Sequence, residues 1–265
     1  MQTGFNLLFI TQDDPFYVRC FFDEFFKTYP VLEDIQGVII ENPMGKKSTW
    51  GLVRQMYAFY GSMDFIRVSL RYAKVKALNA LCKSHKETGW LNLKNLCRRH
   101  DRVAYYQDGI HKTEFLDRLR RMNLDLIVSV AAPSIFREEL INLPRLGCIN
   151  IHHAPLPRYR GMMPNFWQLY HGEKTVGITI HKINEKIDEG EILLQRQIPV
   201  VPGESLDELI KRTKRAGAHL MVEAIESLKK GENHFEKNRS EEGSYFSFPT
   251  SRDVRKFRSM GYRLL

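Results

Sequence analysis

Paired cysteines and long apolar runs are both missing from this chain of 265 residues. Its four cysteines are scattered and form no C-x-x-C pair, which argues against a disulfide scaffold and against a cysteine zinc site. No apolar run approaches the ~18 residues of a membrane span, and the N-terminus lacks the basic segment of a signal peptide. We therefore predict a cytoplasmic protein with no membrane span.

Enough apolar residues are present to form a sizeable core. Hydrophobic residues make up 43% of the chain and aromatic residues 11%, which argues against a disordered protein. The net charge is +9, and it is concentrated between Lys46 and Arg121, where 17 Lys and Arg face 6 Asp and Glu. Such a region attracts phosphorylated molecules, a polyglutamated cofactor, acidic lipid or nucleic acid. A solvated basic surface is an equal alternative.

Short apolar runs alternate with helical patterns through the first 150 residues. The runs read as strands at 6–10, 37–40, 125–130 and 148–151, and helical spacing appears at 15–29 and 113–122. Continuous apolar runs separated by helices are typical of parallel strands that are buried on both faces. The pattern predicts an α/β fold with a Rossmann-like, doubly wound, mostly parallel sheet.

An insertion at about 45–100 interrupts this alternation. Its apolar residues follow helical spacing and its other faces are basic: Met63, Ile66, Leu70, Ala73, Ala77 and Leu81 against Arg67, Arg71, Lys74 and Lys76. The spacing predicts a basic amphipathic helix. It could bind a membrane surface or a partner, but such a helix more often packs its apolar face on its own domain.

The second half of the chain contains further strand and helix signals. A short helix is expected at 164–172, two strands at 177–183 and 191–200, and a capped helix from Ser205 to Lys229 or Lys230, with Gly231 as its stop. We predict a main domain at 1–200, followed by a C-terminal helix and a short appendage at 201–265.

Two adjacent histidines follow the predicted strand that ends near residue 152. His152 and His153 would point to opposite faces of a strand, and no H-x-x-x-H pair occurs, so we expect no metal site. Asn150 and His152 share a face at the carboxyl end of a strand, where α/β sheets bind ligands. An imidazole there can move protons and an amide can donate to an oxyanion. The alternative is a buried structural histidine and a turn asparagine.

Asp188 lies in a predicted turn between two strands. It is either an ordinary turn aspartate or a carboxylate that orients His152. Sequence spacing alone does not bring the two together.

Four motifs in order resemble one family. Asn150-Ile-His152, LPRYRG, GITIH and Asp188-Glu-Gly190 match the formyltransferases that use N10-formyltetrahydrofolate, over roughly 125–201. That family includes methionyl-tRNA, glycinamide ribonucleotide and sugar-nucleotide N-formyltransferases. The resemblance implies that Asn150, His152 and Asp188 are the catalytic residues of a formyltransferase. Asn150 and protonated His152 would stabilise an oxyanion, while Asp188 would hold His152 and help to move the amine's proton.

The resemblance also implies where the two substrates bind. The formyl donor would lie against two loops, 131–136 and 184–188, with contacts from Ala132, Ser134, Ile135, Phe136, Glu185, Lys186 and Ile187. The loop after the catalytic histidine would line the acceptor pocket through His153, Pro155, Tyr159, Arg160 and Gly161. No metal is implied.

Departures from the family pattern bear on the acceptor. The loop reads His153-Ala154-Pro155 where the family usually has serine and leucine, which changes the pocket wall. Asp13 and Asp14 replace a phosphate-binding loop and would repel the phosphate of glycinamide ribonucleotide. The transfer RNA enzymes carry a further C-terminal domain, whereas only 64 residues follow Val201 (265 − 201).

By elimination, the leading acceptor is a small amine: an amino sugar on a nucleotide. The alternatives are formylation of another amine such as methionyl-tRNA, hydrolysis of formyltetrahydrofolate, and a non-catalytic folate- or nucleotide-binding protein. Binding of RNA or membrane by the basic insertion also stays open, although nucleic acid is not favoured. A homodimer is compatible with the sequence.

Overall fold

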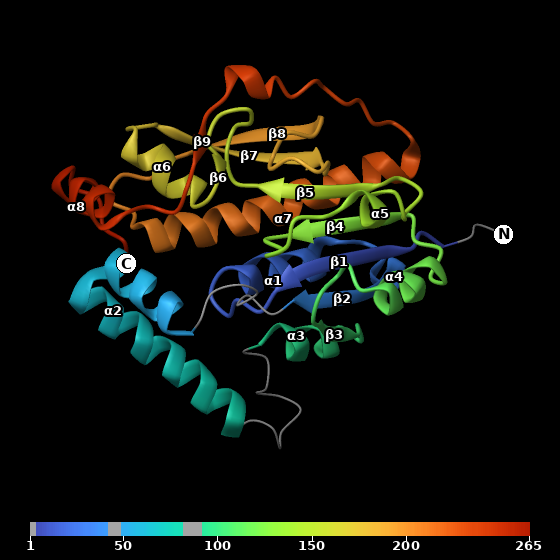
Figure 1. Cartoon of the computed structure of the whole chain (residues 1–265), viewed down its shortest axis with the longest axis horizontal. Helices are drawn as coiled ribbons and strands as arrows, with labels where there is room; N and C mark the ends of the chain where they lie inside the picture. The colour runs from blue at the N-terminus through green and yellow to red at the C-terminus, as the bar shows by residue number, and fades with distance from the viewer. Residues whose placement is uncertain (1–3, 42–48, 82–91) are drawn as a thin grey trace.

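One seven-stranded sheet forms the centre of the molecule (Figure 1). The computed structural model describes residues 4–41, 49–81 and 92–265. The strand order is β3-β2-β1-β4-β5-β7-β8. The first five strands pair in parallel: β1 (Leu7–Gln12), β2 (Ile35–Glu41), β3 (Ala104–Gln107), β4 (Leu126–Val130) and β5 (Cys148–His152). The antiparallel strands β7 (Thr175–Lys182) and β8 (Ile192–Pro199) complete the sheet. The predicted Rossmann-like, mostly parallel sheet is confirmed.

Helices cover both faces of this sheet, as the apolar runs predicted. Leu7 and Phe9 of β1 pack in one core with α1 (Val18–Thr28), α3 (Leu93–Arg99) and α7 (Leu206–Lys230). The alternate residues Leu8 and Ile10 pack in a second core with α4 (Thr113–Arg120) and α5 (Glu138–Ile141). Successive side chains of a strand point to opposite faces, so one short apolar run supplies both cores.

Helix α7 begins and ends where the sequence indicated. Ser205 and Glu208 form the predicted capping box, and Gly231 ends the helix with a φ of 71°. Its buried face contributes Ala218 and Met221 to the core on the α1 side of the sheet. The division proposed after residue 200 stays a prediction.

The basic insertion contains α2 (Thr49–Leu81), which breaks at Gly61 with a φ of 67°. Before the break, Phe59 is 3% exposed and packs 5.9 Å from the ring of Phe166 in α6 (Pro164–Tyr170). After the break, Arg71 donates to Asp207 of α7 at 3.1 Å. The insertion is therefore fastened to the domain by an aromatic anchor and by an ion pair.

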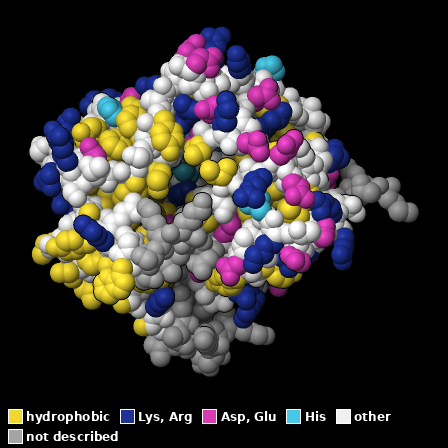
Figure 2. Space-filling view, viewed as in Figure 1, with side chains coloured by type: hydrophobic (Ala, Val, Ile, Leu, Met, Phe, Trp, Pro, Cys, Tyr) yellow, Lys and Arg dark blue, Asp and Glu magenta, His cyan; other side chains and the backbone are white. Residues whose placement is uncertain are grey.

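The predicted apolar face of α2 does not pack on its own domain, and that interpretation was wrong. Met63, Ile66 and Leu70 are 68%, 54% and 65% exposed. Hydrophobic side chains gather over the start of α2 in Figure 2, at the lower left. Asp64 and Arg71 lie on the inward face instead. Each forms an ion pair with a residue of another helix. Leu81 lies outside the residues whose side chains the structure describes.

The C-terminal appendage packs beside α6. Strand β9 (Tyr245–Phe246) pairs with β6 (Arg160–Gly161), and α8 (Ser251–Ser259) buries Phe257 4.6 Å from the ring of Phe166. Among the described residues, no helix is long and apolar enough to cross a membrane.

Candidate active site

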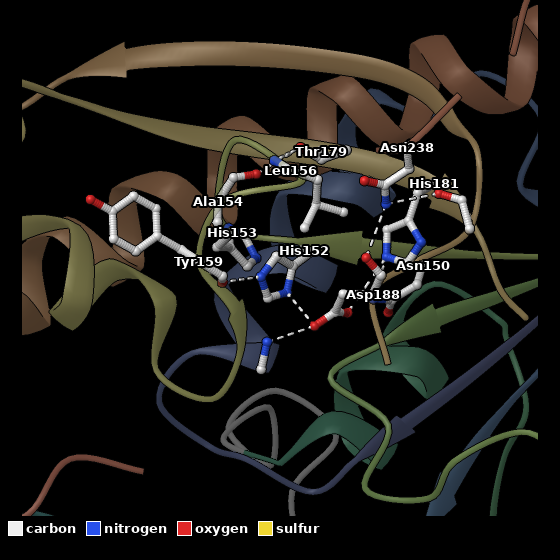
Figure 3. A network of polar contacts seen from close by, with 12 residues as sticks. Asn150, His152, His153, Ala154, Leu156, Tyr159, Thr179, His181, Asp188 and Asn238 are labelled. Carbon is white, nitrogen blue, oxygen red and sulfur yellow. Dashed lines mark hydrogen bonds and ion pairs between the residues drawn. The ribbon is translucent and has the colours of Figure 1, made fainter. Parts of the chain in front are cut away.

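The side chains of Asn150 and His181 meet on neighbouring strands (Figure 3). Asn150 of β5 lies opposite His181 of β7, and its Nδ2 is 3.2 Å from His181 Nε2. His181 Nδ1 lies 2.7 Å from the carbonyl oxygen of Lys182, which can only accept a hydrogen bond. Nδ1 of His181 therefore donates to this carbonyl, and its Nε2 faces the Asn150 amide.

His152 is held between two acceptors. Its Nε2 donates to the carbonyl oxygen of Tyr159 at 2.8 Å, and its Nδ1 lies 3.5 Å from Oδ2 of Asp188. Burial lowers the pKa of His152, and the Asp188 carboxylate and the Tyr159 carbonyl offset only part of this effect. The resting imidazole is therefore neutral. Since Nε2 is occupied, Nδ1 is the ring nitrogen that can exchange a proton.

Asp188 is placed by the turn between β7 and β8. Its Oδ2 accepts the backbone N–H of Gly161 at 2.9 Å, and its Oδ1 lies 3.7 Å from His181 Nε2. Burial acts to raise the pKa of Asp188, but the charge of His152 in its protonated form, the contact with His181 and the Gly161 N–H outweigh burial and hold the pKa at about 2. The carboxylate is ionised and faces both histidines (Figure 3).

Left-handed backbone recurs around this cluster. Ala131, Tyr159 and Asp188 have φ values of 54°, 61° and 55°. Such a conformation in a residue other than glycine costs about 1–3 kcal/mol and is concentrated at functional sites. At Tyr159 it accompanies the carbonyl contact with His152, and at Asp188 it accompanies the contacts with both histidines.

The predicted acceptor residues divide into two groups. Tyr159 and Gly161 reach His152 and Asp188 through their backbone, whereas the Tyr159 ring packs against Phe246 at 5.6 Å. Arg160 forms an ion pair with Glu189. The other group packs against neighbouring elements. His153 lies against α7, where a Cβ on Gly217 would be 3.3 Å from its Cε1, and Pro155 packs against Gly177.

The residues predicted to contact the formyl donor also lie in different settings. Ser134 Oγ donates to Glu41 Oε1 at 2.8 Å, Phe136 is 3% exposed in the core beside Ala132, and Ile135 is 60% exposed. Glu185 and Lys186 line a cavity of about 460 Å³ together with residues of α5. Ile187 is 41% exposed. Contacts of these loops with a donor stay a prediction.

Two polar residues of this region, His181 and Lys214, were missed in the sequence. His181 could have been found, because it alternates with Thr179 in GITIH and so shares a face of β7. Lys214 could also have been found, because it occupies the apolar spacing of α7 with Ala218, Met221 and Ile225. The charge of Asp14 predicts repulsion of a phosphate, but the sequence does not indicate the contacts that its carboxylate makes. Its Oδ1 accepts the backbone N–H groups of Phe16 and Tyr17 at 2.7 and 3.1 Å.

Metal binding has no structural support in the described segments, where no three His, Cys, Asp or Glu side chains are grouped to hold an ion. The amide, the imidazole and the carboxylate lie together at the carboxyl end of β5, the position at which doubly wound sheets bind ligands. Residues 71–225 match the family model described as formyl transferase. The chain belongs to the formyl transferase family, so the resemblance predicted from the motifs is confirmed.

A methionyl-tRNA formyltransferase from Thermotoga maritima is 37% identical over 139 residues, which are 52% of this chain and 44% of that protein. The match thus spans less than half the length of this curated relative. Two solved structures share the fold at low identity. A sugar N-formyltransferase from Shewanella sp. has a TM-score of 0.56 at 18% identity, covering 92% of this chain and 76% of the other. A phosphoribosylglycinamide formyltransferase from Anaplasma phagocytophilum has a TM-score of 0.58 at 14% identity, covering 93% and 100%.

Proposed function

We propose that this protein transfers a formyl group from N10-formyltetrahydrofolate to the amine of a nucleotide-linked amino sugar. The observation that carries the proposal is the placement of Asp188 at 3.5 Å from Nδ1 of His152, with Asn150 on the same face of β5. Family membership adds the reaction class. Acyl transfer to an amine requires a donor to the developing oxyanion and a group that moves the amine's proton, and this cluster contains both.

Asn150 supplies the oxyanion contact. Its amide has two N–H bonds, and within the described residues only one of them meets a partner, His181 Nε2. The second is free to donate to the formyl oxygen as negative charge develops there. Because His181 is fixed by the Lys182 carbonyl, the Asn150 amide is held in one orientation before any substrate binds.

His152 carries the proton. As the amine nitrogen bonds to the formyl carbon, Nδ1 of His152 accepts a proton from that nitrogen, and it then returns the proton to the nitrogen that leaves the same carbon. The proton lost by the attacking amine therefore ends on the leaving nitrogen, and no water is consumed. While His152 is charged, it lies between the Asp188 carboxylate and the Tyr159 carbonyl, which stabilise the imidazolium.

The donor fits the two loops beside this cluster. A pterin has a polar edge and two apolar faces, so it needs backbone donors and acceptors together with exposed apolar side chains. Ile135 and Ile187, one from each loop, are exposed and can cover a ring. Glu41 holds the first loop through Ser134. N10-formyltetrahydrofolate supplies the formyl group when it is bound.

The choice of acceptor depends on the charged residues outside the catalytic cluster. Asp14 accepts the backbone N–H groups of Phe16 and Tyr17 just before α1, and these groups would otherwise suit a phosphate. This supports an amino sugar over glycinamide ribonucleotide. Methionyl-tRNA is the second candidate, because the sequence relatives bear that name and because Arg54, Arg67, Lys74 and Lys76 of α2 are exposed.

Release of tetrahydrofolate from N10-formyltetrahydrofolate tests the proposal. Candidate amines are supplied in parallel: dTDP-linked and UDP-linked amino sugars, and methionyl-tRNA. Release that depends on an amino sugar supports the proposal. Release with methionyl-tRNA alone would replace the acceptor, and release without any amine would make the protein a hydrolase.

A further inference from the structure

We propose that Asp14 and Lys214 form an acceptor subsite beside His152 and bind a sugar hydroxyl group between them. This inference rests on the proposed function and specifies its acceptor. Asp14 follows β1 and Lys214 lies in α7, so the two charges reach the carboxyl end of the sheet from different elements.

Lys214 is an almost buried cation with no direct partner among the residues that the structure describes. Its side chain is 7% exposed, and its ammonium makes no hydrogen bond and no ion pair within 4 Å in the described part of the chain. Burial lowers the pKa of Lys214 to about 8, and Asp14 is the main group opposing that shift. The part of α7 that carries Lys214 lies against the residue after His152, because a Cβ on Gly217 would be 3.3 Å from His153 Cε1. The charge of Lys214 also lowers the pKa values of His152 and His153. A buried charge of this kind is costly unless something binds it.

Asp14 offers the matching acceptor. Its Oδ1 is occupied by the N–H groups of Phe16 and Tyr17, whereas no hydrogen bond to Oδ2 is formed by the residues the structure describes. Asp14 is held in the turn before α1 and Lys214 belongs to α7, and within the described residues no ion pair joins the two side chains. A hydroxyl group fits this arrangement, since it can accept from the ammonium and donate to the carboxylate at once.

Further buried polar atoms beside Lys214 lack partners. Both ring nitrogens of His153 and Oδ1 of Asn165 are unpaired, although these residues are only 7% and 4% exposed. Asn165 Nδ2 donates to Thr213, the neighbour of Lys214, and His153 lies against Gly217 one turn further along α7. Native proteins rarely leave such atoms unpaired, so several in one place indicate a polar ligand.

The chemistry favours a sugar over the other acceptors. A phosphate would meet the Asp14 carboxylate, and a methionine side chain would leave every one of these groups unpaired. A ring with several hydroxyl groups presents donors and acceptors together. Figure 2 shows a hollow in the surface over the carboxyl end of β5, with histidine and basic side chains at its floor.

Calorimetric binding tests the subsite without depending on turnover. The probes are a UDP-linked and a dTDP-linked amino sugar, each compared with an analogue that lacks one ring hydroxyl. Lys214→Met and Asp14→Asn should each weaken binding of the better probe by about 10- to 100-fold, the worth of a hydrogen bond to a charged group. For the wild-type protein, at least one deoxy analogue should show a similar loss, and that loss should shrink in the variants.

Two controls separate this role from a structural one. Lys230→Met makes the same change at an exposed position of α7 and should leave binding unchanged. Thermal unfolding of Lys214→Met should show no loss of stability, because the change removes a buried charge. Equal affinity of wild type and both variants, or no binding of either probe to the wild type, would overturn the subsite. Tight binding with no formyl transfer would leave the subsite standing and overturn the proposed function.

Discussion

The carboxylate of Asp188 lies 3.5 Å from Nδ1 of His152, although the two residues belong to the β7–β8 turn and to the end of β5. The antiparallel pairing of β5 with β7 brings them together. Asp188 is ionised and the buried imidazole is neutral, so a proton gained at Nδ1 is stabilised at once by the adjacent negative charge.

Removing the proton carrier should abolish most of the turnover. His152→Ala is expected to lower kcat for formyl transfer by about 100- to 10,000-fold, the usual worth of a positioned acid–base group. The assay is amine-dependent release of tetrahydrofolate. His219→Ala is the matched control, because His219 is an exposed histidine of α7 that pairs with Glu24. Equal losses in both variants would point to a general effect on the protein rather than to catalysis.

The charge of Asp188 should make the free energy of unfolding depend on pH in the acidic range. Its pKa is about 2 in the folded protein against 3.8 for an unperturbed group, so its contribution is complete above the unperturbed value and is lost as the pH falls toward 2. The wild-type advantage over Asp188→Asn in free energy of unfolding should therefore shrink by roughly 2 kcal/mol between about pH 6 and pH 2.

Urea unfolding of both proteins across this pH range measures that gap. Asp108→Asn, at an exposed position, is the control. A gap between wild type and Asp188→Asn that stays constant with pH would contradict the assignment of a strongly ionised Asp188.

Gly190 is required by a close approach of backbone to backbone. A Cβ at this position would overlap the carbonyl oxygen of Lys182, the group that fixes His181. Gly190→Ala should lower the free energy of unfolding by about 1–3 kcal/mol and reduce turnover, because the turn that carries Asp188 must shift. Gly4→Ala, where no atom lies within 4 Å of the new Cβ, should change neither quantity. Wild-type stability in Gly190→Ala would contradict the prediction, because it would mean that the turn accommodates a Cβ without loss of free energy.

Some parts of the fold and of the candidate site could be predicted from the sequence, and others could not. Asn150 and His152 were predictable because alternation along a strand places them on one face. Strand β3 was not, since only Ala104 of its four residues is buried and no apolar run marks it. The spacing of α2 defines its faces but not which face points inward. That choice depends on Asp207 and Arg258, distant in sequence, which pair with Arg71 and Asp64.

Glu41 should affect donor binding without touching the chemistry. It holds the loop 131–136 through Ser134, and burial raises its pKa. Glu41→Ala is expected to raise KM for N10-formyltetrahydrofolate about 5- to 10-fold, because a hydrogen bond worth about 1 kcal/mol or more is lost, while kcat changes little. Ser134→Ala removes the same bond from the other side and should behave alike. A fall in kcat with unchanged KM would place Glu41 in the reaction itself.

The two faces of α2 should differ sharply in their contribution to folding. Phe59→Ala removes a buried ring and is expected to cost about 3–5 kcal/mol in the free energy of unfolding. Leu70→Lys changes an exposed position and should stay within about 0.5 kcal/mol of wild type. Denaturant unfolding compares the two. A large loss in Leu70→Lys would mean that the exposed face is covered in solution.

Formyl transfer itself is tested most directly by tetrahydrofolate release measured with and without an amino sugar, in the wild-type protein and in Asp188→Asn. We expect release in the wild type only when the nucleotide-linked amino sugar is present, accompanied by one formylated sugar per tetrahydrofolate. We expect Asp188→Asn to retain its fold and to lose nearly all of that release. Release at the same rate without the sugar, or undiminished in Asp188→Asn, would contradict the proposed reaction or its catalytic cluster.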